Sequence, residues 1–336
     1  MKYILVTGGT GFIGSHTCTL LLENNYKVII IDNLIHSNEN IVSKIELITN
    51  KKILFFKRDL SENIEDIFIR YDIHAVIHFA ALKSVPDSIS NPIIYYKNNI
   101  ISTINLIETM QKYKCHNLIF SSSATVYGNN ISPLSEDMIT GKNISNPYGQ
   151  TKFMIEQILK DVAIADPKFN IISLRYFNPI GAHPSGIIGE SPTSPSSNLM
   201  PHILKSTNNP NQKLQIFGNT YNTPDGTCIR DYIHVMDVAL AHMLALKKNN
   251  TLLSNYNSFN IGRGIGTSVL ELIYAFEKSN NVNVPHKFVN KRKGDLNSVF
   301  CETHLSKNIL NFEPTYSIED ACKHAWNFYQ RNLIIN

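Results

Sequence analysis

The chain has 336 residues, of which 43% are hydrophobic and 17% charged, so it can bury a core larger than that of one typical compact domain. Its formal net charge of +4 is small and its basic residues are scattered, which argues against nucleic acid as a partner. The apolar run after Tyr3 is far too short for a signal-peptide core or a membrane span, so we expect a cytoplasmic protein with no membrane partner.

The first half of the chain alternates short apolar, β-branched runs with longer helical patterns. Six runs are predicted to be strands: Tyr3–Thr7, Lys27–Asp32, Ile53–Lys57, Ala75–Phe79, Asn117–Ser121 and Ile171–Tyr176. Most are continuous rather than alternating in polarity, as expected for strands buried on both faces. One predicted helix begins near Pro92 and carries Ile100, Ile104 and Ile107 on one side. This rhythm predicts an α/β fold with a doubly wound, parallel, Rossmann-type sheet.

The second half is less regular. Residues 181–201 are rich in Gly, Pro and Ser and are predicted to form a loop, and Tyr221–Thr227 is a second turn-rich stretch. Asp231–Lys247 reads as a strand followed by a helix, Asn257–Gly262 as a strand, and Ser268–Lys278 as a helix.

These patterns predict two structural units. Residues 1–178 would form the Rossmann-type domain, and residues 231–262 would return to it. Residues 179–230 and 263–336 would form a smaller mixed α/β lobe that binds the substrate on the C-terminal side.

Five cysteines are spread along the chain, at Cys18, Cys115, Cys228, Cys301 and Cys322. The number is odd and no two form a CxxC pair, so neither structural disulfides nor a metal site is expected. Reduced thiols fit a cytoplasmic protein.

A glycine-rich turn follows the first strand, with Gly8, Gly11 and Gly14 at three-residue intervals. Glycine permits a tight turn and a close approach of the backbone to a pyrophosphate. The helix that follows, from Ile13 to about Asn24, would point its first N–H groups at that phosphate. A glycine turn alone is weak evidence, but its place between a strand and a helix predicts a dinucleotide site.

Asp32 ends the second strand, where a carboxylate can accept hydrogen bonds from an adenosine ribose. The same charge would repel a 2′-phosphate, and Asn33 offers no compensating cation. The sequence therefore favours NAD over NADP.

Ser123, Tyr148 and Lys152 form the candidate catalytic set. Asn146 and Pro147 read as the N-cap and first residue of a helix, which places Tyr148 and Lys152 one turn apart on one face. A lysine ammonium and a cationic nicotinamide would both lower the pKa of the tyrosine. Tyr148 would then take a proton from a sugar hydroxyl as hydride leaves the same carbon, while Ser123 holds the reacting oxygen.

Several stretches together resemble the UDP-glucose 4-epimerases of the extended short-chain dehydrogenase/reductase family. They span about residues 3–300 and include Val6–Gly14, Ile77–Lys83, Phe120–Gly128, Asn146–Lys152, Leu174–Gly186, Asn198–Pro201, Asp225–Asp237 and Gly294–Leu296. The resemblance implies that bound NAD oxidises C4 of a UDP-hexose, that the 4-keto sugar rotates, and that hydride returns to its opposite face. The enzyme would be an isomerase that keeps its NAD, and it would be a homodimer through helices at about 91–113 and 148–165.

The resemblance also implies binding roles. Asp59 and Leu60 would flank the adenine, Lys83 would meet the cofactor phosphates or ribose and the substrate, and Asn98 would lie beside the cofactor. The remaining implied cofactor residues are Phe12, Ile13, Asn33, Phe79, Ala80, Ser121, Tyr148, Lys152 and Phe177. The implied substrate residues, besides Ser123 and Lys83, are Asn178, Asn198, Leu199, Arg230, Tyr232, Arg292 and Asp295.

Val299 is the residue that counting forward from Gly294 places against the C2 side of the sugar, by the same resemblance. A valine there would admit an N-acetyl group, so that UDP-N-acetylglucosamine could be a substrate as well. A shift of one residue would instead put Phe300 at this wall and close the pocket.

The chain departs from the family pattern at Ala81, at Pro86-Asp87 and at Lys293, which bears on local loop shape. Three other functions remain open. A nucleotide-sugar 4,6-dehydratase would need an acid pair where this chain has Ala124-Thr125. An epimerase or decarboxylase of UDP-glucuronate would need extra cations, and a non-catalytic NAD sensor would not need the Ser–Tyr–Lys set.

Overall fold

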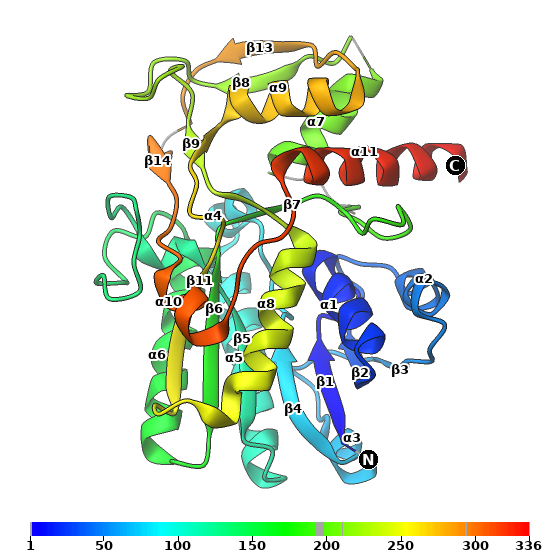
Figure 1. Ribbon diagram of the computed structural model, residues 1–336. Coiled ribbons are helices and arrows are strands. Elements are labelled where there is room, and N and C mark those ends of the chain that lie inside the picture. The colour runs from blue at the N-terminus through cyan, green and yellow to red at the C-terminus, as the bar shows by residue number, and fades with distance from the viewer. Residues whose placement is uncertain (1, 192–197, 210, 293, 336) are drawn as a thin grey trace.

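The computed structural model describes residues 2–191, 198–209, 211–292 and 294–335 (Figure 1). Its centre is a seven-stranded sheet in the order β11-β6-β5-β4-β1-β2-β3, and every neighbouring pair is parallel. The strands are β1 (Tyr3–Thr7), β2 (Lys27–Asp32), β3 (Leu54–Lys57), β4 (Ile73–His78), β5 (Asn117–Ser123), β6 (Asn170–Tyr176) and β11 (Tyr256–Ile261). The predicted doubly wound sheet is confirmed. The strand order reverses between β1 and β4, which opens a crevice at their carboxyl ends.

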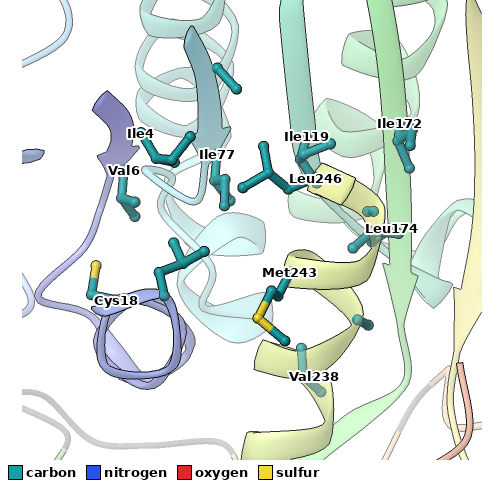
Figure 2. Close-up of a cluster of buried hydrophobic side chains, with 14 of the residues drawn as sticks. Ile4, Val6, Cys18, Ile77, Ile119, Ile172, Leu174, Val238, Met243 and Leu246 are labelled. Atoms are coloured by element: carbon teal, nitrogen blue, oxygen red, sulfur yellow. The ribbon is translucent and has the colours of Figure 1, made fainter. Parts of the chain in front are cut away.

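Helices cover both faces of this sheet. Ile4, Ile30 and Ile77 point to one face and Leu5, Ile29 and Val76 to the other, in two separate buried clusters. On the first face the strands pack against α1 (Phe12–Glu23) and α8 (Val235–Lys248), as Figure 2 shows. The second face is covered by α3 (Glu65–Arg70), α5 (Pro92–Lys112) and α6 (Pro147–Ala165). Burial of both faces explains why the strand sequences are continuously apolar.

A smaller lobe lies above the carboxyl ends of the sheet in Figure 1. Its buried cluster joins α7 (Leu199–Asn208), β8 (Leu214–Phe217), α9 (Val269–Asn280) and α11 (Ile318–Ile335). Other elements are α2 (Asn40–Thr49), α4 (Val85–Ser90), the 3-10 helices η1 (Ala124–Tyr127) and η2 (Asn249–Thr251), β7 (Asn178–Ile180), β9 (Ile229–Arg230), β10 (Tyr232–His234), β12 (Thr267–Ser268), β13 (His286–Val289), β14 (Ser298–Val299) and α10 (His304–Leu310). The lobe therefore closes over the edge where the crevice opens.

Several predicted boundaries are off by one to three residues; the strand predicted at Ala75–Phe79, for example, is β4 (Ile73–His78). The expected loop at 181–201 ends earlier, because α7 begins at Leu199; Pro201 fits its first turn, where a backbone N–H has no helical partner to lose. Residues 192–197 of that stretch, and the departure at Lys293, lie outside the described residues. Strand β5 runs past Ser121 to Ser123, because its ladder with β6 continues to the pair Ser123–Tyr176.

Candidate active site

The glycine turn joins β1 to α1 in a close-packed form. Gly8 has a φ of +69°, and its N–H donates to Ile31 O at 2.8 Å. A Cβ atom on Gly14 would lie 2.3 Å from the Gly8 oxygen, and one on Gly8 would lie 2.7 Å from Ala80 N. Gly11 caps α1 without a side-chain hydrogen bond. The turn thus presents bare backbone and a helix N-terminus, which fits a pyrophosphate.

A cavity of about 500 Å³ extends from this turn to α6, a volume suited to a small-molecule site. The predicted cofactor residues that line it are Gly8, Gly11, Phe12, Ile13, Gly14, Asp32, Asn33, Asp59, Leu60, Phe79, Ala80, Lys83, Asn98, Ser121, Tyr148 and Lys152. Phe177 lies outside the lining, in a buried cluster with Ala124 and Tyr127. Asn198 lines the cavity from the substrate lobe.

Asp32 is fixed at one end of the cavity by hydrogen bonds. Its carboxylate accepts from Thr10 N at 3.1 Å and from Ser37 Oγ at 3.1 Å. Asn33 Nδ2 donates to the second carboxylate, Asp59, at 2.7 Å. Two carboxylates in the lining of one cavity suit ribose hydroxyls and disfavour a phosphate.

Two cations near this end were not anticipated. Arg58 lines the cavity, but its guanidinium binds both carboxylate oxygens of Asp66, at 2.9 and 3.2 Å. Lys44 of α2 also lines the cavity. Lys44 and Arg58 are single basic residues outside any motif, so no pattern in the sequence would have marked them as part of the site.

The catalytic candidates meet at the other end. Asn146 caps α6, accepting a hydrogen bond from Gly149 N at 2.8 Å with Pro147 as first helical residue, as predicted. Lys152 Nζ donates to Ser121 O at 2.6 Å and lies 5.9 Å from the centre of the Tyr148 ring. The strand end that carries Ser123 is thereby held against the helix that carries Tyr148.

The electrostatics differ from the prediction for Tyr148. Burial raises the pKa of Tyr148 to about 12, against a hydrogen bond from Ser123 that lowers it. Burial also lowers the pKa of Lys152 to about 7, against the attraction of the Glu156 carboxylate. The protein alone therefore does not lower the tyrosine pKa, since the lysine donates its hydrogen bond to a backbone carbonyl and burial dominates.

The candidates for the diphosphate and uridine gather in the smaller lobe. Asp295 lies between two cations, 3.5 Å from Arg230 Nη2 and 3.0 Å from Arg292 Nε. The Arg292 guanidinium also covers the Phe217 ring at 4.5 Å. Two arginines on one carboxylate retain positive charge, and guanidinium groups bind phosphate oxygens in pairs.

The other predicted substrate residues lie on neighbouring strands and helices. Asn178 and Tyr232 are partners in the small sheet of β7 and β10. Leu199 is the first residue of α7, and Asn198, which precedes it, donates to Glu190 Oε1 at 2.6 Å. Of these four residues, Asn198 is the one that lines the cavity.

Val299, the last residue of β14, and Phe300, which follows it, have different neighbours. Val299 pairs with Arg230 and packs against the buried cluster that contains Ala124 and Phe177. The Phe300 ring lies instead beside Gly266, where an added Cβ atom would come within 3.2 Å of it. Of the two residues, the valine is the one that packs in the cluster of Phe177.

Besides Arg58 and Lys44, sequence reasoning missed other residues of the cavity and its surroundings, four of which follow. Tyr176 lines the cavity and donates or accepts a hydrogen bond with His242 Nε2 at 2.6 Å. Glu190 lines it 4.0 Å from Lys83 Nζ, and burial raises the Glu190 pKa. Ser37 and Phe217 complete the set. Tyr176 could have been found, because it ends a predicted strand directly before Phe177, whereas the others depend on long-range packing.

The described residues contain neither a cluster of metal ligands nor a membrane-spanning helix. No group of three or more His, Cys, Asp or Glu side chains among them could hold a metal ion. None of the helices, within the part of the chain that the structure describes, is long and apolar enough to cross a membrane. All five cysteines are free and buried.

Known proteins are similar to this chain in sequence and in fold. Residues 4–262 match the model of the NAD dependent epimerase/dehydratase family. A UDP-glucose 4-epimerase of Bacillus subtilis is 44% identical over 335 residues, which cover 98% of this chain and 97% of the relative. The crystal structure of UDP-glucose 4-epimerase from Stenotrophomonas maltophila with bound NAD and formylated UDP-arabinopyranose is similar with a TM-score of 0.96, 40% identity and 99% coverage of both chains. The crystal structure of UDP-glucose 4-epimerase from Bifidobacterium longum in complex with NAD⁺ and UDP is similar with a TM-score of 0.94, 39% identity and 99% coverage of both chains.

Proposed function

The chain belongs to the NAD dependent epimerase/dehydratase family, and on that premise we propose that it interconverts UDP-glucose and UDP-galactose as a UDP-glucose 4-epimerase. One observation carries the proposal: Ser121, Tyr148 and Lys152 line one end of a dinucleotide-sized cavity whose other end is the glycine turn, and Ser123 lies within hydrogen-bond reach of Tyr148. The Arg230–Asp295–Arg292 cluster lies in the lobe above it.

The described residues fit NAD. Bare backbone at Gly8, Gly11 and Gly14 admits the pyrophosphate, and Asp32 would accept from the adenosine ribose. When bound, NAD supplies an acceptor for the C4 hydride and later its donor. Lys152, on the nicotinamide side, would hold the second ribose.

Residues of the chain accept and return the proton of the C4 hydroxyl. As the C4–H bond breaks and its electron pair leaves as hydride, the C4 hydroxyl gives its proton to the Tyr148 oxygen and the C4–O bond becomes a carbonyl. Ser123 donates a hydrogen bond to that oxygen. After the 4-keto sugar rotates, hydride returns to the other face and Tyr148 returns the proton. The burial that raises the Tyr148 pKa must be offset by positive charge near the phenol, so proton uptake is coupled to an occupied cofactor site.

A 4,6-dehydratase is disfavoured by the turn after β5. Elimination of water requires an acid and a base beside C5 and C6, and η1 begins with Ala124 and Thr125, whose backbone N–H is engaged with Ser123 Oγ at 3.3 Å.

The proposal is tested by incubating the purified protein with UDP-galactose and no added NAD. UDP-glucose should form, because the cofactor stays bound through a cycle with no net redox change. Protein that is folded and carries NAD, yet gives no UDP-glucose, would refute the proposed activity.

The purified protein is predicted to carry NAD and not NADP. Asp32 and Asp59 occupy the ribose end, and Arg58 is committed to Asp66. Denaturing the protein and identifying the released nucleotide checks this. Recovery of mostly NADP would show that Lys44 or Arg58 binds a 2′-phosphate and that the assignment is wrong.

The sugar pocket is proposed to admit an N-acetyl group as well. Support comes from Val299, a small side chain on the Phe177 side of β14, and from Phe300, which packs away toward Gly266. UDP-N-acetylglucosamine would then be a second substrate.

The protein is further proposed to be a cytoplasmic homodimer, with its free buried thiols supporting a reducing compartment. For the dimer, α5 exposes Ile93 at 73%, Ile101 at 41% and Ile104 at 36%, and the adjoining α6 exposes Met154 at 37%. Neighbouring apolar side chains on two packed helices are typical of an interface.

Replacing Ile101 and Ile104 together by Asp should therefore convert the dimer to a monomer, because two charges would be buried at its centre. Light scattering coupled to size exclusion measures the mass. Ile131→Asp, at a loop residue that is 87% exposed, is the matched control and should stay dimeric. A monomeric wild-type protein at micromolar concentration would contradict the proposal.

A further inference from the structure

Helix α6 carries a third polar group in line with Tyr148 and Lys152. Glu156 follows Lys152 by one turn and is completely buried. A buried carboxylate is costly unless it is paired and hydrogen-bonded. Its neighbours therefore indicate what it does.

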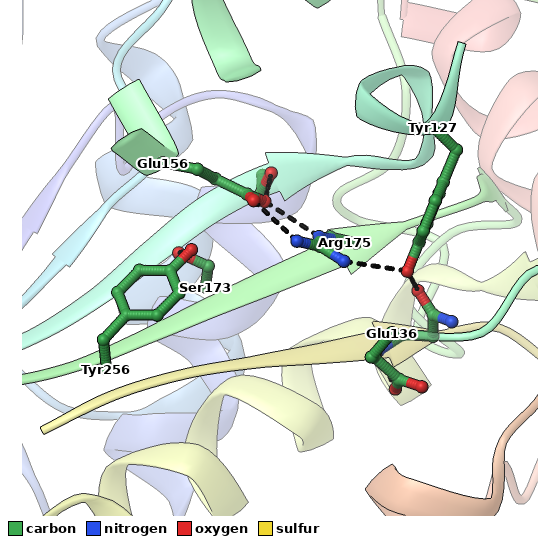
Figure 3. Close-up of polar contacts among 8 residues, drawn as sticks. Tyr127, Glu136, Glu156, Ser173, Arg175 and Tyr256 are labelled. Atoms are coloured by element: carbon green, nitrogen blue, oxygen red, sulfur yellow. Dashed lines mark hydrogen bonds and ion pairs between the residues drawn. The ribbon is translucent and has the colours of Figure 1, made fainter. Parts of the chain in front are cut away.

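The Glu156 carboxylate joins the helix to two strands (Figure 3). Arg175 of β6 donates to both of its oxygens, Nε to Oε1 at 2.9 Å and Nη2 to Oε2 at 2.7 Å. Ser122 of β5 donates to Oε1 at 2.6 Å. Ser122 lies between Ser121 and the candidate catalytic Ser123. The Ser121 carbonyl accepts the hydrogen bond from Lys152 Nζ. One carboxylate thus fixes the strand end on which the site is built.

The same network reaches the turn beyond Ser123. Arg175 Nη1 donates to the Tyr127 hydroxyl at 2.9 Å, at the end of η1. Tyr127 donates to Asn260 Oδ1 of β11 at 2.7 Å, and Asn260 N donates to Glu136 at 2.7 Å. Both ends of the Ser121–Tyr127 segment are therefore anchored through Arg175 and Glu156.

We propose that Glu156 is a positioning residue of the reaction: its carboxylate holds Ser121–Ser123 against α6, and its charge balances the buried Lys152 cation. This inference rests on the proposed epimerase function. Glu156 has no place in the cavity lining and touches no reacting atom, so it acts through the lysine and the strand end.

Burial lowers the pKa of Lys152 and the negative charge of Glu156 raises it, and a purely structural contact would not have this second effect. Groups that face Lys152 or the Glu156–Arg175 pair are His78 of β4, Tyr127 of η1, Tyr148 of α6, Tyr176 of β6, Tyr256 of β11 and Glu136. Burial lowers the pKa of His78 to about 3 and raises that of each of these tyrosines. Lys152, with a pKa of about 7, changes its charge near neutral pH.

The test compares Glu156→Gln, which keeps the shape and removes the charge, with Glu156→Asp, which keeps the charge. Without the carboxylate, Lys152 loses its proton at lower pH, so the alkaline fall of kcat in Glu156→Gln should move down by about one pH unit. Glu156→Asp should lower kcat but leave the alkaline fall at the wild-type pH. Glu136→Gln, at the far end of the network, is the matched control and should not move it.

An alkaline fall at the wild-type pH in folded Glu156→Gln that retains its cofactor would overturn the proposal. If that variant does not fold because Arg175 is left unpaired, the double variant Glu156→Gln/Arg175→Met replaces it. The double variant should lose at least ~10-fold in kcat with little change in KM, and a wild-type kcat would overturn the proposal. Inactive wild-type protein would instead refute the epimerase function itself.

Discussion

Tyr148→Phe should lower turnover at least ~100-fold, the low end of what a positioned acid–base group contributes, while fold and bound NAD are retained. The phenol oxygen is the only part removed, and in the proposed reaction it is the group that takes the C4 hydroxyl proton. The hydrogen bond of Lys152 to Ser121 O does not involve this oxygen, so the site should keep its shape. Steady-state turnover of UDP-galactose measures the effect.

Tyr113→Phe is the matched control, because that hydroxyl donates to Glu65 at 2.8 Å on a distant surface of the protein. It should retain wild-type turnover. If Tyr148→Phe is also near normal while its NAD content is intact, Tyr148 has no part in proton transfer.

Val299→Tyr should abolish activity on UDP-N-acetylglucosamine and spare UDP-glucose. A ring in place of the valine would occupy the space proposed for the acetamide, and a steric conflict of about 2.7 kcal/mol in the transition state lowers kcat/KM about 100-fold. Parallel assays of both sugars on wild type and variant give the ratio. Val299→Ala, which enlarges the pocket, should keep both activities.

The wild-type protein can contradict this prediction before any variant is made. If it turns over the N-acetylated sugar orders of magnitude more slowly than UDP-glucose, the pocket is closed and Val299 is not its limiting wall. Equal loss of both activities in Val299→Tyr would indicate a general disruption of β14.

The sequence predicted the Rossmann core well because its signals are local. Strands β1 and β2 have the predicted bounds, since both are apolar runs bordered by turn residues. The start of α6 was also predictable, because Asn146-Pro147 is a capping pattern that depends on adjacent residues only. The glycine turn and Asp32 follow from this frame, as the carboxyl ends of parallel strands meet at one edge. The other cofactor residues were implied by the family resemblance.

What could not be predicted depends on distant pairing. The contact of Arg292 with Phe217 joins segments from β8 and the chain after β13, and no spacing in the sequence implies it. Whether Val299 or Phe300 faces the sugar depends on the register of a two-residue strand. The pKa of Tyr148 was not predictable either. Helical spacing placed Lys152 beside Tyr148 correctly, but the burial that raises the pKa of Tyr148 is a property of the folded site.

In the proposed reaction, hydride leaves and returns to the same C4 within one protein that has its own NAD. The most direct test supplies UDP-galactose with deuterium at C4 and no added cofactor, and follows the product by mass spectrometry and NMR. The account predicts UDP-glucose that retains the deuterium at C4. Product that has lost the label to solvent, or a 4-keto-6-deoxy sugar in place of UDP-glucose, would contradict it.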